Sequence, residues 1–385
     1  MEEKTFGALD LGSSKIKVIV VKEKNESFEL IEKIEKDSEG IKKGKVVEPE
    51  KLTKVLKWIT REIPKVPPFF VNLGGEYLSS FPSRGIVNVS RADQVVTEED
   101  IKRAFKSAET QKFSFHREVL DVIPQYYILD NEIKTENPLG MKGFKMELQA
   151  LLILGIKPYF ENLQKSLKMA NIEVLDFVPD PIALSFSVLK EKEKEKGACI
   201  LNIGAEITEV CVFKDGYLKN FFVLPLGSEI ITNKLALFLK KDFEIAERVK
   251  IEFGNCLSKE KKEKLILEEG KTFSKSTISK RIREALLKIF DEIKKEMKKN
   301  LDEKEFPGGI ILCGGGAKIK GIEELAKQKF QHFCRIGKPK KILGLNEDPS
   351  FTLCEGLILA GTSKEKEERE GIFSKIINFF KGFIP

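Results

Sequence analysis

The chain has 385 residues, of which 41% are hydrophobic and 33% charged, so it can bury a large core in two or three domains. Its 67 basic and 60 acidic side chains leave a net charge of only +7, which argues against a nucleic-acid-binding surface. Two histidines and six cysteines without CxxC spacing disfavour a histidine-based metal site, a Ser/His/Asp triad and a disulfide framework.

The cysteines and the apolar runs also indicate a compartment. Cys199, Cys211 and Cys313 lie inside apolar runs and are typical of small core residues in a reducing cytoplasm. No apolar run reaches the roughly 20 residues that span a bilayer, and no secretory signal pattern opens the chain. We therefore expect a cytoplasmic protein, either soluble or bound to a membrane surface.

The first elements in chain order are a strand pair, a helix and a buried strand. Residues 8–22, ALDLGSSKIKVIVVK, predict a strand, a glycine-containing turn and a second strand. Residues 51–63 have helical spacing, and residues 67–75 predict a buried strand that ends in a glycine turn.

The next part alternates in the same way. Residues 97–109 predict a helix, with Thr97 as its N-cap and Asp100 three residues later. Residues 146–156 predict a strand and residues 159–170 a helix. Mixed strands and helices of this kind are typical of an α/β protein.

A repeat then divides the chain into two halves. Residues 200–214, ILNIGAEITEVCVFK, align without a gap on residues 8–22, at an offset of 192 residues (200 minus 8). The charged residues 189–198 before the second copy predict an exposed connection. The identical pairs are Leu9/Leu201, Gly12/Gly204, Val18/Val210, Val20/Val212 and Lys22/Lys214. One copy opens each half, which favours a duplicated two-domain fold over two unrelated hairpins.

The second half continues with a long helix and a third glycine turn. Residues 276–299 predict a helix with one apolar stripe. The stripe consists of Ile278, Ile282, Leu286, Ile289, Ile293 and Met297. Residues 306–330 predict a strand, a glycine-rich turn and a helix.

The glycine turns are candidate nucleotide-binding loops, although the chain has neither a Walker A motif nor GxGxxG. In the first turn, backbone N–H groups and the hydroxyls of Ser13 and Ser14 suit phosphate oxygens, and Lys17 can supply a positive charge. Asp10 at the end of the strand can orient a hydrated Mg²⁺. Taken singly, each glycine turn is more often structural than functional.

Two phosphate-type hairpins in duplicated halves, followed by GGGA before a helix, resemble the superfamily of actin, sugar kinases and heat-shock chaperone ATPases. Within it the chain resembles the FtsA family of bacterial cell-division proteins over essentially its whole length. The segments that carry the resemblance are 40–52 (GIKKGKVVEPEKL), 71–89 (VNLGGEYLSSFPSRGIVNV), 117–132, 137–143 (NPLGMKG), 224–236, 246–254 and 313–326. The SRG and NPLGMKG stretches are far more specific than the glycines.

The resemblance implies an actin-like (ribonuclease H-like) duplicated α/β fold with an FtsA-type extra subdomain. The implied parts are a first core of residues 1–83 and 158–193, the extra subdomain 84–157, and a second domain 194–345 with an outer subdomain at about 243–306. A return helix 346–362, a charged linker 363–370 expected to be disordered, and an amphipathic membrane-targeting helix 371–385 follow.

The resemblance also implies a nucleotide site, with ATP and Mg²⁺ as cofactors. Its implied residues are Asp10, Gly12, Ser13, Ser14 and Lys17 in the first loop, Gly204 and Thr208 in the second, Gly227 and Ser228 beside the phosphates, Glu247 and Lys250 near adenosine, and Gly314, Gly315 and Gly316 in the adenosine loop. Asp180 matches the position of a water-positioning residue in chaperone relatives. Its other interpretation is structural, as the N-cap of a helix with Pro181 at the first position.

The second hairpin departs from the family pattern. The family ordinarily has Asp-Ile-Gly-Gly-Gly-Thr-Thr-Asp, whereas residues 202–209 read Asn-Ile-Gly-Ala-Glu-Ile-Thr-Glu. Asn202 brings no charge to hold Mg²⁺, Ala205 lacks the backbone freedom of glycine, and an inward Glu206 would repel phosphate. We therefore expect weak ATP binding, very slow hydrolysis or both, so that the protein is at most a weak ATPase.

Residues 371–385 give a membrane prediction that depends on no family. On a helix, one face would carry Ile372, Phe373, Ile376, Ile377, Phe379, Phe380, Phe383 and Ile384, with Lys375 and Lys381 opposite. A core helix is the alternative. The polar segment before it and the pairing of phenylalanine with lysine favour an in-plane anchor on anionic lipid.

Together these features predict a cytoplasmic actin-like cell-division protein on the inner face of the membrane at the division site. The resemblance implies four partners: the C-terminal peptide of the tubulin-like FtsZ, further copies in a filament, anionic lipids, and other division proteins through residues 84–157. No nucleic-acid partner is expected. The alternatives are a PilM-like scaffold of a pilus or secretion assembly, and a sugar kinase of the same superfamily.

Overall fold

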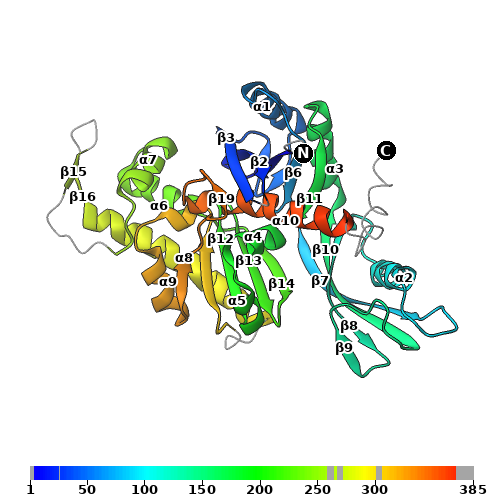
Figure 1. Ribbon diagram of the computed structural model, residues 1–385. Helices are drawn as coiled ribbons and strands as arrows, with labels where there is room; N and C mark the ends of the chain where they lie inside the picture. Colours follow the sequence, from blue (N-terminus) through cyan, green and yellow to red (C-terminus); the bar gives the residue numbers. More distant parts are fainter. Residues whose placement is uncertain (1–3, 26, 258–263, 267–271, 301–305, 370–385) are drawn as a thin grey trace.

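The computed structural model describes residues 4–25, 27–257, 264–266, 272–300 and 306–369 (Figure 1). Its first sheet has the spatial order β11-β6-β1-β2-β3-β19. The strands are β1 Thr5–Leu11, β2 Lys15–Lys24, β3 Ser27–Asp37, β6 Phe69–Leu73, β11 Val174–Pro179 and β19 Ile342–Leu343. A separate small hairpin consists of β4 Ile41–Lys42 and β5 Lys45–Val46.

The second sheet repeats this design in the order β14-β13-β12-β17-β18. Its strands are β12 Ala198–Ile203, β13 Thr208–Lys214, β14 Tyr217–Leu224, β17 Gly309–Cys313 and β18 Cys334–Ile336. In both sheets an antiparallel hairpin, β1–β2 or β12–β13, is followed by a third antiparallel strand, β3 or β14. The first strand of each hairpin also pairs in parallel with a later strand, β1 with β6 and β12 with β17. The predicted duplication and the actin-like fold class are confirmed.

Helices form layers on both sides of the sheets. Helices α1 (Pro49–Glu62) and α3 (Lys157–Met169) cover the outer face of the first sheet, and α6 (Glu229–Leu239), α7 (Phe243–Phe253), α8 (Lys275–Asn300) and α9 (Ile322–Phe330) pack on the second. Between the sheets lie α4 (Asp180–Val188) and α10 (Thr352–Arg369) (Figure 1). Large side chains such as Phe70 and Leu357 fill this central core. Burial of each such side chain stabilises the fold by roughly 1.5–3 kcal/mol.

An inserted unit lies beside the first sheet and has a core of its own. Its sheet has the order β7-β10-β8-β9 and is covered by α2 (Glu98–Glu109). The strands are β7 Ser79–Asn88, β8 Arg117–Leu129, β9 Ile133–Thr135 and β10 Lys145–Ile156. Strand β7 begins at Ser79, whereas we expected this subdomain to begin at residue 84.

Local signals in the sequence account for individual helices. Thr97 caps α2, and its side chain and the Asp100 carboxylate form the reciprocal capping box that the sequence predicts. Burial opposes ionisation of Asp100, but hydrogen bonds from Thr97, Arg103 and Ser90 outweigh it and lower the pKa. In α8 the whole predicted apolar stripe is buried.

Other expectations differ from the structure. Helix α10 continues through the charged segment to Arg369, so residues 363–369 are helical where we expected a disordered linker. Pro179, not Asp180, is the N-cap of α4, and Asp180 makes no capping hydrogen bond. The exposed connection at residues 189–198 contains the short helix α5 (Glu191–Lys196). The membrane helix expected at residues 371–385 lies outside the described residues.

The outer subdomain at about residues 243–306 contains α7, α8 and a small hairpin of β15 (Lys264–Ile266) and β16 (Thr272–Ser274). Among the described residues, no helix combines the length and the apolar character needed to cross a membrane.

Candidate functional site

A cavity of about 410 Å³ lies between the two halves, where the turns of both duplicated hairpins meet. Most of the residues proposed from the sequence line it: Asp10, Gly12, Ser13, Ser14, Lys17, Asp180, Asn202, Gly204, Ser228, Glu247, Lys250 and Gly314–Gly316. The structure therefore brings together side chains from segments hundreds of residues apart. Thr208 and Gly227 do not line the cavity.

Thr208 and Gly227 instead hold the second turn from behind. The buried Thr208 hydroxyl donates to the carbonyl oxygen of Leu226 at 2.7 Å. A Cβ on Gly227 would lie 2.2 Å from the Ala205 carbonyl oxygen, so only glycine permits this approach. The next two amides, of Ser228 and Glu229, donate to the carbonyls of Gly204 and Ala205.

In the first turn, Asp10 and Lys17 form a buried ion pair with Lys17 Nζ 3.3 Å from Asp10 Oδ2. Burial raises the pKa of Asp10, and the neighbouring Lys17 offsets this only in part. The amide side chain of Asn72, on the adjacent strand β6, accepts from the Leu11 amide at 2.8 Å. Lys17 therefore neutralises Asp10 as well as facing the cavity.

A second set of acidic side chains, Asp180 and Glu209, lines the cavity, and Glu209 was not predicted from the sequence. Glu209 of β13 accepts hydrogen bonds from Asn202 Nδ2 at 2.9 Å and from the Gly75 amide of the other half at 3.3 Å. It also shares a hydrogen bond with Asp180, whose Oδ2 accepts from Asn72 Nδ2 at 3.3 Å. The signal was a single acidic residue inside the apolar strand EVCVF.

Burial raises the pKa of both acids, and for Asp180 the negative charges of Glu209 and Asp10 raise it further. Two buried carboxyl groups in contact cannot both ionise easily, so Asp180 favours its protonated form. The second oxygen, Asp180 Oδ1, is buried and accepts no hydrogen bond from any described residue. In the ionised form of Asp180 this oxygen, beside Asp10 and Glu209, would fit a hydrated Mg²⁺, and the charge of the ion would favour that form.

We expect Asp180→Asn to change how stability depends on pH. An acid with a raised folded-state pKa stabilises the fold fully below its ordinary pKa and loses that stability as the pH rises through the folded value. Between the ordinary pKa and the folded-state pKa, the free energy of unfolding of the wild type should fall by up to about 1.4 kcal/mol per pH unit relative to that of the variant. Urea denaturation between about pH 5 and pH 8 measures this difference.

Asp215→Asn, in the exposed turn between β13 and β14, is the matched control for loss of one acidic side chain. Asp215 has a φ of 55°, which asparagine tolerates. If Asp180→Asn and Asp215→Asn show the same pH slope, Asp180 does not carry the extra proton.

The other end of the cavity combines a charged pair with apolar side chains. Lys250 Nζ lies 2.7 Å from Glu247 Oε2, and both contact the hydroxyl of Thr232. Phe243 and Ile251, on the same helix, line the cavity with exposed side chains, a pattern that suits a flat base. Phe243 and Ile251 were not among the residues proposed from the sequence.

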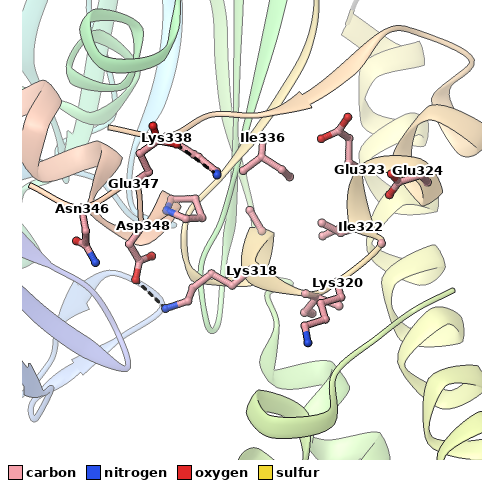
Figure 2. A pocket seen from close by; sticks show the side chains of 14 residues that line it. Lys318, Lys320, Ile322, Glu323, Glu324, Ile336, Lys338, Asn346, Glu347 and Asp348 are labelled. Atoms are coloured by element: carbon pink, nitrogen blue, oxygen red, sulfur yellow. Dashed lines mark hydrogen bonds and ion pairs between the residues drawn. The ribbon is translucent and has the colours of Figure 1, made fainter. Parts of the chain in front are cut away.

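A second, more open hollow of about 590 Å³ lies against the same glycine-rich turn (Figure 2). It shares Lys318, Ile319 and Lys320 with the cavity between the halves. Ion pairs join Lys318 to Asp348 at 2.8 Å and Lys338 to Glu347 at 3.5 Å (Figure 2). The first pair connects the turn to residues 346–349, which lead into α10, and the second connects the segment after β18 to the same residues.

The second hairpin turn differs in two respects from what we expected. Ala205 does not occur among the described residues with positive φ, so no glycine is required there. Glu206 does not line the cavity; its carboxylate accepts a hydrogen bond from the Lys43 amide of hairpin β4–β5. The lack of glycine's backbone freedom at Ala205 is therefore no obstacle to this turn, and Glu206 contacts a backbone amide beside the cavity.

Comparison with families of known proteins gives consistent matches. A family described as "Cell division protein FtsA" matches residues 199–356, and one described as "SHS2 domain inserted in FTSA" matches residues 75–154. The FtsA of Bacillus subtilis is 29% identical over 365 residues, covering 92% of this chain and 82% of that protein. The FtsA of Pseudomonas aeruginosa is 28% identical over 386 residues, covering 94% and 91%.

Solved structures share the fold at lower sequence identity. The PilM–PilN type IV pilus biogenesis complex has a TM-score of 0.67 at 19% identity, covering 92% of this chain and 98% of that chain. MreB5 of Spiroplasma citri bound to AMPPNP has a TM-score of 0.59 at 14% identity, covering 96% of this chain and 100% of that chain. The MamK double helical filament has a TM-score of 0.53 at 12% identity, covering 94% of this chain and 99% of that chain.

Proposed function

The chain belongs to the FtsA family of cell division proteins, and we propose that it binds a nucleotide, polymerises on the membrane and tethers FtsZ filaments there. The observation that carries the nucleotide part is the cavity between the halves, lined by the turns of both duplicated hairpins. Those turns offer backbone amides and the hydroxyls of Ser13 and Ser14 to phosphate oxygens.

The site residues have separate roles in this proposal. Asp10 would hold a hydrated Mg²⁺ through water, and that ion would offset phosphate charge when bound. Lys17 neutralises Asp10 in its absence. Phe243, Ile251 and the Glu247–Lys250 pair would contact the base and ribose at the other end.

Hydrolysis is proposed to be slow. A protonated Asp180 is a poor acceptor for a proton from attacking water, and Asn202 lacks the charge of a carboxylate. The protein then acts mainly as a scaffold whose assembly responds to nucleotide binding. Turnover of several ATP per second would contradict this part.

Binding to FtsZ is the part that separates this function from the alternative of a PilM-like scaffold, a protein with a similar fold at 19% identity. We expect a peptide from the FtsZ C-terminus to bind the outer subdomain, where α8 exposes Lys280 and Lys288. Replacing both by glutamate should weaken binding about tenfold or more through reversed charge. Fluorescence anisotropy of a labelled peptide measures this.

The matched control reverses Lys54 and Lys57 on α1, which are equally exposed but lie on the other half. A wild-type protein that ignores the FtsZ peptide would favour the pilus-type scaffold instead. Phosphorylation of a sugar by the wild type would support the sugar-kinase alternative, and we expect none.

A further inference from the structure

Glu206 connects the two halves at the edge of the cavity. It lies in the turn between β12 and β13, and its carboxylate accepts the Lys43 amide from hairpin β4–β5. The neighbouring Ala205 and Ile207 line the cavity, and so does Gly44 on the opposite side. The Glu206–Lys43 hydrogen bond therefore joins the two halves at the rim of the cavity, next to residues that line it.

The receiving hairpin is held firmly in position. Lys43 and Gly44 both have positive φ, 49° and 72°, and form the tight turn between β4 and β5. The Gly44 amide donates to Ser13 Oγ at 2.9 Å, so the hairpin also contacts the first phosphate-type turn. The Glu76 amide donates to the Lys43 carbonyl, and its carboxylate pairs with Lys45 Nζ at 2.8 Å.

The Lys43 amide can bind an anion, and the Glu206 carboxylate already accepts its hydrogen bond. A phosphate oxygen placed between the two hairpin turns would compete for the same amide and would lie close to the negative charge of Glu206. With the base at the end lined by Phe243 and Ile251, as proposed above, the last phosphate of the chain would lie nearest the hairpin, so the electrostatic penalty would be larger for a triphosphate than for a diphosphate.

We propose that Glu206 competes with the terminal phosphate for the Lys43 amide and thereby makes the site favour nucleoside diphosphates over triphosphates. This inference rests on the proposed nucleotide function. It assigns Glu206 a specificity role in binding. Two variants separate its charge from its hydrogen bond: Gln keeps an acceptor for the Lys43 amide without the charge, and Ala removes both.

The first measurement needs no nucleotide. In Glu206→Ala, hydrogen exchange of the Lys43 amide should accelerate about tenfold or more, since its acceptor is lost. Glu206→Gln should show a smaller increase, and Glu62→Gln, at the exposed end of α1, should show none. Unchanged exchange in Glu206→Ala would overturn the proposed contact.

The second measurement is calorimetric titration of ADP and ATP with Mg²⁺. We expect Glu206→Ala to raise ATP affinity about tenfold or more while ADP affinity changes less than about threefold, with Gln also favouring ATP because the charge is gone. Equal gains for both nucleotides would overturn the specificity role. Faster exchange at Lys43 without binding of either nucleotide to any variant would instead contradict the nucleotide function, and with it this inference.

Discussion

Replacing Glu355 by alanine is expected to lower the free energy of unfolding by about 3–5 kcal/mol. The Glu355 carboxylate is fully buried in α10 and accepts the backbone amides of Lys340, Lys341 and Ile342 at 2.8, 2.5 and 3.2 Å. Its other oxygen accepts the Ser187 hydroxyl of α4 at 2.6 Å. Alanine would leave the Ile342 amide and the Ser187 hydroxyl buried without this acceptor, and the partly buried amides of Lys340 and Lys341 would lose theirs.

The effect is large because of where the three amides lie. Residues 337–342 cross between the halves: the Gly337 amide donates to Leu312 of the second sheet, and Ile342 pairs with Phe28 of the first. Glu355, itself in α10, binds both this segment and Ser187 of α4, so it holds the segment against both central helices. Next to it, a Cβ on Gly356 would lie 2.0 Å from the Ala183 carbonyl oxygen, so α4 and α10 are in backbone contact.

Urea denaturation followed by circular dichroism and by the fluorescence of Trp58, the one tryptophan in the sequence, measures the loss. Glu355→Gln should cost less, about 1–2 kcal/mol, because its carbonyl can still accept the amides. Glu347→Ala, which removes an exposed pair with Lys338 of this segment, should cost under about 1 kcal/mol. A loss below that level for Glu355→Ala would contradict the role of the carboxylate.

Deleting residues 371–385 is expected to reduce binding to anionic liposomes by about tenfold or more. These residues lie outside the described part of the chain, so the expectation comes from their sequence alone. Transfer of two or three phenylalanines to the interface contributes about 1.5–3 kcal/mol each, less the free energy needed to order the helix. Co-sedimentation with liposomes over a range of lipid concentrations measures the change.

A charge variant distinguishes the two contributions to lipid binding. Replacing Lys375 and Lys381 by glutamine should weaken binding to anionic liposomes by about 1 kcal/mol for each lysine and leave neutral liposomes unaffected. Deletion should weaken both. Unchanged lipid binding after deletion would refute the membrane anchor and leave the nucleotide and FtsZ proposals standing.

Sequence patterns predicted the secondary structure where the determining contacts are local. The capping box of Thr97 and Asp100 and the apolar stripe of α8 depend on residues three or four apart, so both could be predicted. Residues 363–369 were mispredicted as a linker because their charge indicated disorder, whereas they continue a helix that begins in the central core.

The candidate site could be predicted in outline but not in its contacts. Glycine turns and the repeated hairpins indicated which segments converge, and most of the proposed residues line one cavity. Glu209 and Asn72 left a weak signal, each a single polar residue in an apolar strand. The contact between Glu206 and Lys43 left none, because the acceptor binds a backbone amide 163 residues away and every residue except proline has such an amide.

The sequence by itself therefore determined the duplication, since a repeat and its spacing are properties of the chain, and the resemblance to the FtsA family implied the actin-like fold. It also identified the second hairpin as a departure from the family pattern. Only the tertiary structure decided what that departure does: Ala205 is unstrained, Glu206 binds the Lys43 amide, and Glu209 shares a hydrogen bond with Asp180. Side-chain charge can be read from the sequence, but the direction of a side chain and the pKa of a buried acid depend on the groups that folding places around it.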